Sequence, residues 1–143
     1  MSQDNPKTSI LFFTEEIDFK LSQEEKILNW IHQIISTENA EVALLNYIFG
    51  SDEYILEINK EYLNHDYYTD IITFPLSQSP IESDIFISID RVKDNAASFS
   101  KSFKSELLRV IAHGLLHLIG YNDKSEEEQQ IMRAKENEYI ELF

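Results

Sequence analysis

The chain of 143 residues contains no cysteine. It therefore forms no disulfide and offers no thiolate, so any metal ion must be bound by His, Asp or Glu. It also lacks a run of about 18 to 20 consecutive apolar residues, the length needed to span a bilayer. Its first 20 residues show no basic start, apolar run and small-residue cleavage site. These absences predict a cytoplasmic protein with no membrane partner.

Basic residues are scarce as well: 12 Lys and Arg stand against 26 Asp and Glu, giving a formal net charge of −14. This balance argues against a general binder of DNA or RNA, because non-specific affinity comes largely from cations that neutralise phosphates. Five basic residues nevertheless gather in one stretch, at Arg91, Lys93, Lys101, Lys104 and Arg109. The stretch is either a local positive surface or a solvated helix face.

The chain has enough apolar residues, 43%, for one sizeable core, and no repeat or linker divides it. We therefore expect a single domain over residues 1–143. Short apolar runs predict strands at Thr8–Phe13, Val42–Phe49, Ile71–Phe74 (ended by Pro75) and Asp84–Asp90. Helical periodicity predicts helices at 22–36 (with a capping box at Ser22–Glu25), after Gly50-Ser51-Asp52, at 102–119 and from Glu126 onward. The fold class is α+β, with a small mixed sheet of about four strands covered by about five helices.

The most specific pattern is two histidines, His113 and His117, followed by Gly120 and Asp123. Residues four apart lie on the same face of a helix, so both imidazoles can point at one ion. A glycine that ends the helix lets the chain turn back and bring Asp123 as a third ligand. Three ligands leave a position for water, as in catalytic zinc sites. The alternative is a pair of ordinary histidines on a buried helix.

The helix that carries this pattern is apolar on most sides, which predicts a position in the interior. One stripe on it is polar and contains Glu106, Arg109, His113 and His117 at spacings of three and four. Burying such groups without partners costs about 2–7 kcal/mol each. A metal-lined cleft would supply partners for them.

The segment from His113 to Asp123 resembles the signature of the YbeY family, HGxLHLxGYDH, and Glu128 and Met132 follow in register. A second block upstream also resembles that family, at 58–62, Asp66, Thr69-Asp70, Phe74-Pro75 and Asp84-Ile85. The resemblance implies a metal-dependent endoribonuclease that acts on single-stranded RNA in ribosomal RNA maturation, at the 3' end of 16S rRNA, and in ribosome quality control. It also implies ribosomes or ribosomal proteins as partners, and one Zn²⁺ per chain held by His113, His117 and Asp123.

Two positions depart from the family pattern. The family's third histidine is Asp123 here, whose oxygen makes the site harder and more anionic, so Mn²⁺ or Mg²⁺ become alternatives to Zn²⁺. The family's arginine, thought to serve RNA cleavage, is Leu63 here. Either the activity is weaker or another cation contacts the phosphate, and the candidates for substrate binding are His65, Arg91, Lys104 and Arg109.

Two other functions remain as alternatives. The histidine spacing also resembles metzincin-like metalloproteases, but their general base is a glutamate where this chain has Gly114. The second alternative is a ribosome-associated factor whose metal site is only structural, which the loss of the arginine at Leu63 and the acidic composition suggest. Tyr67 and Tyr68 could stack on unpaired bases or pack their loop against the sheet.

Overall fold

A computed structural model describes residues 7–143 of the chain. Within this range it contains four strands and five helices. Their bounds are β1 Ser9–Glu15, α1 Glu24–Thr37, β2 Val42–Gly50, α2 Asp52–Leu63, β3 Ile71–Gln78, β4 Ile81–Ser88, α3 Ile89–Ser98, α4 Phe103–Ile119 and α5 Glu126–Leu142. The expected numbers of strands and helices are confirmed.

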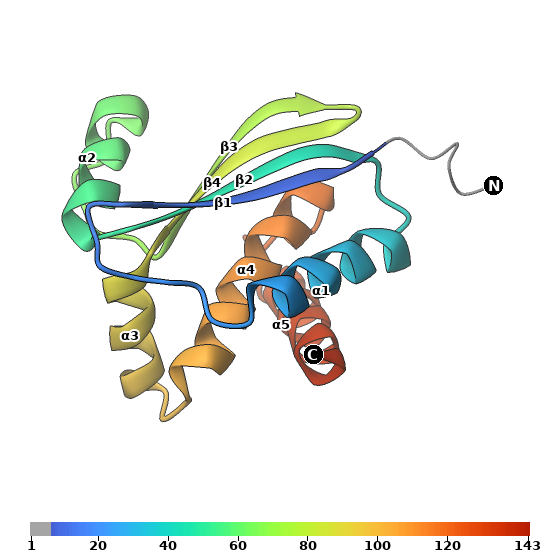
Figure 1. Cartoon of the computed structure of the whole chain (residues 1–143). Coiled ribbons are helices and arrows are strands. Elements are labelled where there is room, and N and C mark those ends of the chain that lie inside the picture. Colours follow the sequence, from blue (N-terminus) through green and yellow to red (C-terminus); the bar gives the residue numbers. More distant parts are fainter. Residues whose placement is uncertain (1–6) are drawn as a thin grey trace.

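The four strands form one mixed sheet in the order β1-β2-β4-β3. The β1–β2 and β2–β4 pairs are parallel, whereas β3 and β4 form an antiparallel hairpin. Helices α1 and α4 lie along one face of the sheet, and α5 packs against α4 (Figure 1). On the other face α2 contacts the hairpin, where Tyr62 packs edge-on against Phe74 at 5.9 Å between ring centroids. The α+β fold predicted from the sequence is therefore confirmed.

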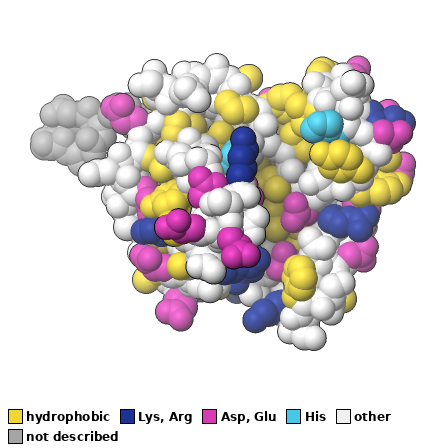
Figure 2. Space-filling model, turned by 180° about the vertical axis from the view of Figure 1, so that it is seen from behind, with side chains coloured by type: hydrophobic (Ala, Val, Ile, Leu, Met, Phe, Trp, Pro, Cys, Tyr) yellow, Lys and Arg dark blue, Asp and Glu magenta, His cyan; other side chains and the backbone are white. Residues whose placement is uncertain are grey.

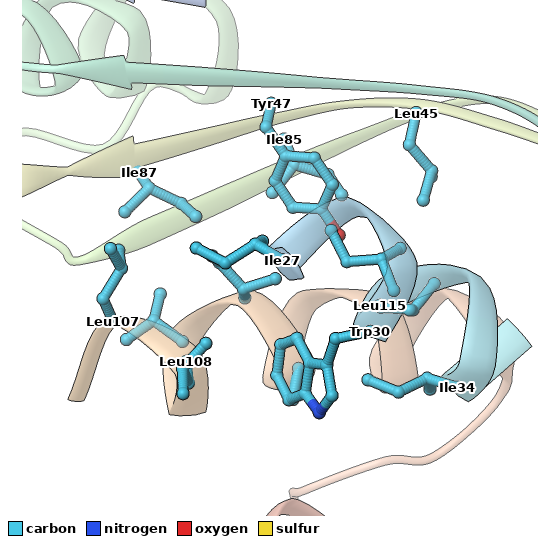
Figure 3. Close-up of a cluster of buried hydrophobic side chains, with 14 of the residues drawn as sticks. Ile27, Trp30, Ile34, Leu45, Tyr47, Ile85, Ile87, Leu107, Leu108 and Leu115 are labelled. Atoms are coloured by element: carbon cyan, nitrogen blue, oxygen red, sulfur yellow. The ribbon is translucent and has the colours of Figure 1, made fainter. Parts of the chain in front are cut away.

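The core lies between the sheet and the helices α1 and α4. Figure 3 shows Leu45, Tyr47 and Ile85 pointing from the strands toward side chains of the two helices. The indole N–H of Trp30 donates a 2.7 Å hydrogen bond to the carbonyl oxygen of Tyr139, which joins α1 to α5. Burying a large apolar side chain contributes about 1.5–3 kcal/mol. A core of this kind holds α4 in a fixed position under the sheet.

Pro75 does not end the third strand, as the sequence suggested, because β3 continues to Gln78. A proline cannot donate a ladder hydrogen bond, but β3 is an edge strand and its register shifts between Pro75 and Ser77. Edge strands and bulges are the places where a sheet tolerates proline. The predicted stop at Pro75 was therefore wrong.

The predicted strand Asp84–Asp90 was misplaced at both ends. β4 begins earlier, at Ile81, and ends at Ser88, whose hydroxyl accepts a 3.1 Å hydrogen bond from the N–H of Arg91 and caps α3. Ile89 and Asp90 thus belong to α3, a helix that the sequence analysis did not place. The β-branched run continued the strand pattern across the cap, so the boundary could not be seen from periodicity.

The capping box expected at Ser22–Glu25 is also absent. The residue that precedes α1 is Gln23, with φ 58°, and its side chain makes no capping hydrogen bond. A capping box exists instead at α5, where the Ser125 hydroxyl accepts from the Glu128 N–H and Glu128 accepts from the Ser125 N–H. None of the helices in residues 7–143 is long and apolar enough to cross a membrane.

Candidate metal centre

The helix α4 presents the two histidines because its ends are well defined. Ser102 caps its start by accepting a 3.0 Å hydrogen bond from the N–H of Ser105. Gly120 ends it with φ 132°, a conformation that side chains with a Cβ rarely adopt, and its N–H reaches the Leu116 carbonyl oxygen at 3.1 Å. The predicted stop at Gly120 is confirmed, and the chain then turns back toward His113.

Gly114 lets α4 approach the sheet closely. A Cβ atom at this position would lie 2.6 Å from Cδ1 of Ile71 and 3.5 Å from Cγ2 of Ile85. Even a methyl group would force Ile71 to move, and a glutamate, the general base of the metzincin-like alternative, would need far more room. The close packing of α4 on the β3–β4 hairpin thus favours a small residue at this position.

The three candidate ligands His113, His117 and Asp123 line one pocket of about 230 Å³, together with Ile71 and Thr73. The His113 Nε2 atom lies 3.4 Å from Oδ2 of Asp123, so the turn after Gly120 brings these two side chains together as expected. Within residues 7–143, however, no three His, Asp or Glu side chains are gathered closely enough to hold a metal ion. The His113–Asp123 pair is formed, and His117 faces the same pocket from an exposed position on α4.

A fourth residue, Glu136 of α5, fixes the orientation of His113. Its carboxylate is buried, with 3% of the residue exposed, and its Oε2 atom lies 2.8 Å from Nδ1 of His113. Since a carboxylate only accepts, the proton of the imidazole is on Nδ1 and Nε2 turns toward Asp123. The Arg109 guanidinium donates to Oε1 of Glu136 at 2.8 Å. Carboxylate–histidine pairs of this kind orient metal-binding histidines in many proteins.

Glu136 and His113 shift each other's pKa values through their hydrogen bond. Burial raises the pKa of the Glu136 carboxyl, but hydrogen bonds from His113 and Arg109 outweigh it and leave the pKa below its ordinary value. The hydrogen bond to Glu136 in turn raises the pKa of His113 above its ordinary value, against the effect of burial. The neutral His113 ring would present the Nε2 lone pair to the Asp123 carboxylate. That contact is favourable only with a proton or a cation shared between the two groups.

Two of the predicted substrate-binding residues, Arg109 and Lys104, lie on α4. Arg109 lines a pocket together with His113, whereas Lys104 makes its contacts at the other end of the helix. Arg109 is 15% exposed and is held by Glu136, so its charge is already partly balanced. The Lys104 ammonium donates to the side-chain oxygen of Gln23 and lies 4.8 Å from the ring centroid of Phe143. Of these two predicted substrate-binding residues, only Arg109 stands next to the histidines.

Arg91 and His65 also have partners of their own. Arg91 donates to Oδ2 of Asp52 at 2.7 Å and lies over the ring of Tyr68, which ties α3 to the start of α2. His65 lies in the exposed loop after α2, and its ring stacks on Tyr67 at 5.1 Å between centroids. Their roles in substrate binding stay predictions.

Arg133 of α5 is a basic residue at the site that the sequence analysis did not single out. It lines two pockets that also contain His113 and Glu136, and its side chain is 61% exposed. Its Nε atom is 3.9 Å from Glu136, a loose contact. Figure 2 shows one face of the molecule on which basic and acidic side chains intermix near the centre, with a histidine partly visible beside them.

Helix α4 with its two histidines and the carboxylate beyond Gly120 thus lie in a mixed α+β domain, and residues of these types bind metal ions in metallohydrolases. The family model described as Endoribonuclease YbeY matches residues 11–143. Endoribonuclease YbeY of Cytophaga hutchinsonii is 52% identical over 136 residues, covering 94% of this chain and 95% of the relative. The protein of that name from Flavobacterium psychrophilum is 47% identical, covering 94% and 96%.

A solved structure agrees with the same assignment. The solution structure of TM1509 from Thermotoga maritima superposes with a TM-score of 0.64 at 28% identity, covering 92% of this chain and 87% of that one. The chain belongs to the YbeY family of endoribonucleases. The resemblance inferred from the two sequence blocks is therefore confirmed.

Proposed function

We propose that the chain is a metal-dependent endoribonuclease that cuts single-stranded RNA, with His113, His117 and Asp123 holding one divalent ion. Membership of the family supports the reaction. The observation that carries the metal site is the 3.4 Å contact between His113 Nε2 and Asp123 Oδ2 at the wall of a pocket that His117 also lines. The two imidazoles and one carboxylate suit Zn²⁺, and the oxygen ligand also admits Mn²⁺ or Mg²⁺.

A divalent ion bound here supplies an activated water and polarises a phosphoryl oxygen. The residues of the chain arrange the rest. Glu136 keeps the proton of His113 on Nδ1, so that Nε2 faces the pocket. Arg109 balances the charge of Glu136 and keeps this carboxylate ionised although it is buried.

The phosphate of the substrate needs a cation, because negative charge builds up on it during cleavage. Leu63 cannot provide one, and Arg109 is held by Glu136. We assign this role to Arg133, which is exposed and lies in the pockets beside His113. A single cation of this kind attracts RNA to the site without making the acidic surface a general binder of nucleic acid.

The cellular substrate proposed is ribosomal RNA during its maturation, at the 3' end of 16S rRNA, with a part in ribosome quality control. The acidic composition supports placement by a partner on the ribosome, since a net charge of −14 repels bulk RNA. The reaction belongs in the cytoplasm, where ribosomes mature.

The experiment is cleavage of an end-labelled single-stranded RNA with Zn²⁺ or Mn²⁺, compared with the same RNA in a duplex. We expect cleavage of the single strand, its loss with a chelator and in His117→Ala, and its survival in the control His32→Ala on α1. Intact RNA together with ribosome binding would contradict the proposal and favour a structural factor. A 2',3'-cyclic phosphate on the product would identify the 2'-hydroxyl as nucleophile rather than water.

A further inference from the structure

A second pocket adjoins the candidate metal centre at His113. Its volume is about 240 Å³, and it shares His113 and Ile71 with the pocket of the three candidate ligands. The polar groups that line it include Asp70, Asn95 and Glu106. The two pockets therefore adjoin at His113 and Ile71.

Glu106 is the feature that needs an explanation. It belongs to the polar stripe of α4, and only 4% of the residue is exposed, yet its side chain lines this pocket. None of the hydrogen bonds or ion pairs within residues 7–143 ends on its carboxylate; burial raises its pKa, and the charges of Arg109 and Arg133, which pair with Glu136, lower it in part. Its oxygens are not among the buried atoms left without a partner, so they reach the pocket and are open to a ligand that donates to them.

Asp70 places a second carboxylate at the same pocket. Asn95 reaches one of its oxygens with a long contact of 3.4 Å, and burial raises the pKa of Asp70 as well. The third carboxylate, Glu136, is already balanced by Arg109 and His113. Asp70 is thus partly satisfied, whereas the Glu106 carboxylate is open to a donor from the pocket, and the two acceptors together favour a ligand that carries N–H donors.

The rest of the pocket suits a flat ring. Phe99, at the end of α3, lines it and is 59% exposed, so its ring is free to stack on a ligand. Ile71 and Val110 add apolar surface. A cavity of about 150 Å³ holds a benzene molecule, so about 240 Å³ accommodates one nucleobase. Stacking on an exposed aromatic side chain is a common way for proteins to hold an unpaired base.

We propose that this pocket binds one unpaired nucleobase beside the scissile phosphate and that Glu106 and Asp70 make it prefer guanine. Guanine carries two adjacent N–H donors, N1–H and N2–H, which one carboxylate can accept together. Uracil has a single N–H between two carbonyl oxygens that a carboxylate repels. Adenine and cytosine offer an amino group next to an acceptor nitrogen and bind with intermediate affinity. The inference rests on the proposed function, because it assumes an RNA substrate.

The test measures binding of GMP and UMP to the full chain by NMR titration, with a chelator present so that no RNA chemistry contributes. Both nucleotides carry the same phosphate, so the attraction of the anion cancels. We expect GMP to bind at least about tenfold more tightly, as for other carboxylate-to-base contacts. In Glu106→Gln, which replaces an acceptor oxygen by a donor, the difference should disappear. In the control Glu57→Gln on the exposed face of α2 it should persist.

Equal affinity of the two nucleotides for the unaltered chain would overturn the proposal, as would a preference that survives in Glu106→Gln. If Glu106→Gln fails to fold, the variant Phe99→Ala tests the pocket instead. Loss of a stacked base costs at least about tenfold in affinity, so a loss of that size for both nucleotides supports the base pocket. Unchanged affinity refutes it. A chain that binds GMP selectively but cuts no RNA would contradict the proposed function alone. A chain that cuts RNA but does not distinguish GMP from UMP would contradict the base pocket alone.

Discussion

Replacing Glu136 by glutamine isolates the part that this buried carboxylate plays in the metal binding proposed for His113. The change keeps the size of the side chain but removes its negative charge. The carboxylate oxygens accept hydrogen bonds from Nδ1 of His113 and from Arg109, each at 2.8 Å. The amide can satisfy one of these donors with its oxygen, and its NH₂ group then faces the other. His113 loses the fixed proton on Nδ1 and with it the orientation of Nε2.

The expected magnitude follows from two effects. Loss of a carboxylate that orients a metal-binding histidine typically lowers metal affinity about 10- to 100-fold. Breaking a buried charge pair costs about 3–5 kcal/mol, and we expect a smaller loss here, about 2–3 kcal/mol, because Arg109 is 15% exposed and keeps its 2.7 Å hydrogen bond to Asn137. Glu136→Gln should therefore remain folded at room temperature and bind the ion weakly.

The assay is calorimetric titration of the metal-free chain with Zn²⁺, accompanied by urea denaturation without metal. Glu138→Gln is the matched control, since Glu138 lies on the same helix, is 54% exposed and makes only a 3.8 Å contact with a lysine. The contrary result is a Glu136→Gln variant that loses the expected stability and yet binds Zn²⁺ within a factor of about two or three of the unaltered chain. That result would show that Glu136 serves the fold and not the metal. Unchanged stability would refute the geometry itself.

Three further predictions concern stability and RNA binding. Gly120→Ala should lower the free energy of urea unfolding by about 1–3 kcal/mol through backbone strain alone, because φ is 132° and no atom lies within 4 Å of the new methyl group; unchanged stability would contradict this. Burial raises the pKa of Glu38, but hydrogen bonds from Tyr139, Tyr121 and Lys135 outweigh it and leave the pKa lowered. Its stabilisation is therefore complete above the ordinary value of 4.5 and lost as the pH falls through the folded value. Glu38→Gln should be about 1.5–3 kcal/mol less stable near neutral pH, and the gap in denaturation curves should close in acid; a gap independent of pH would be contrary to this account. Arg133→Ala should reduce the salt dependence of RNA binding by about one charge and leave the melting temperature unchanged, and an equal salt slope would remove Arg133 from the phosphate site.

The central features of the site were predictable because they are local. His113, His117, Gly120 and Asp123 lie within eleven positions, and helical spacing with a glycine stop was enough to bring Asp123 to His113. The polar stripe that contains Glu106 was also visible in the sequence. What periodicity could not give was the pocket that Glu106 faces, since its other walls come from α3, β3 and α5.

Glu136 and Arg133 were missed because they act through tertiary packing. Glu136 is 23 positions from His113, and the two meet only when α5 docks on α4. A signal did exist: Met132, Glu136 and Tyr139 follow helical spacing and are all buried, so a glutamate interrupts an apolar stripe. A charged residue in such a stripe predicts a buried partner, but not its identity.

The central claim is that His113, His117 and Asp123 hold one divalent ion. Elemental analysis of the untagged chain beside Asp123→Ala tests it most directly, with Asp94→Ala on the exposed surface of α3 as control. The account predicts about one metal ion per chain in the unaltered protein and the control, and its loss in Asp123→Ala. One ion per chain retained in Asp123→Ala would contradict the proposed ligand set.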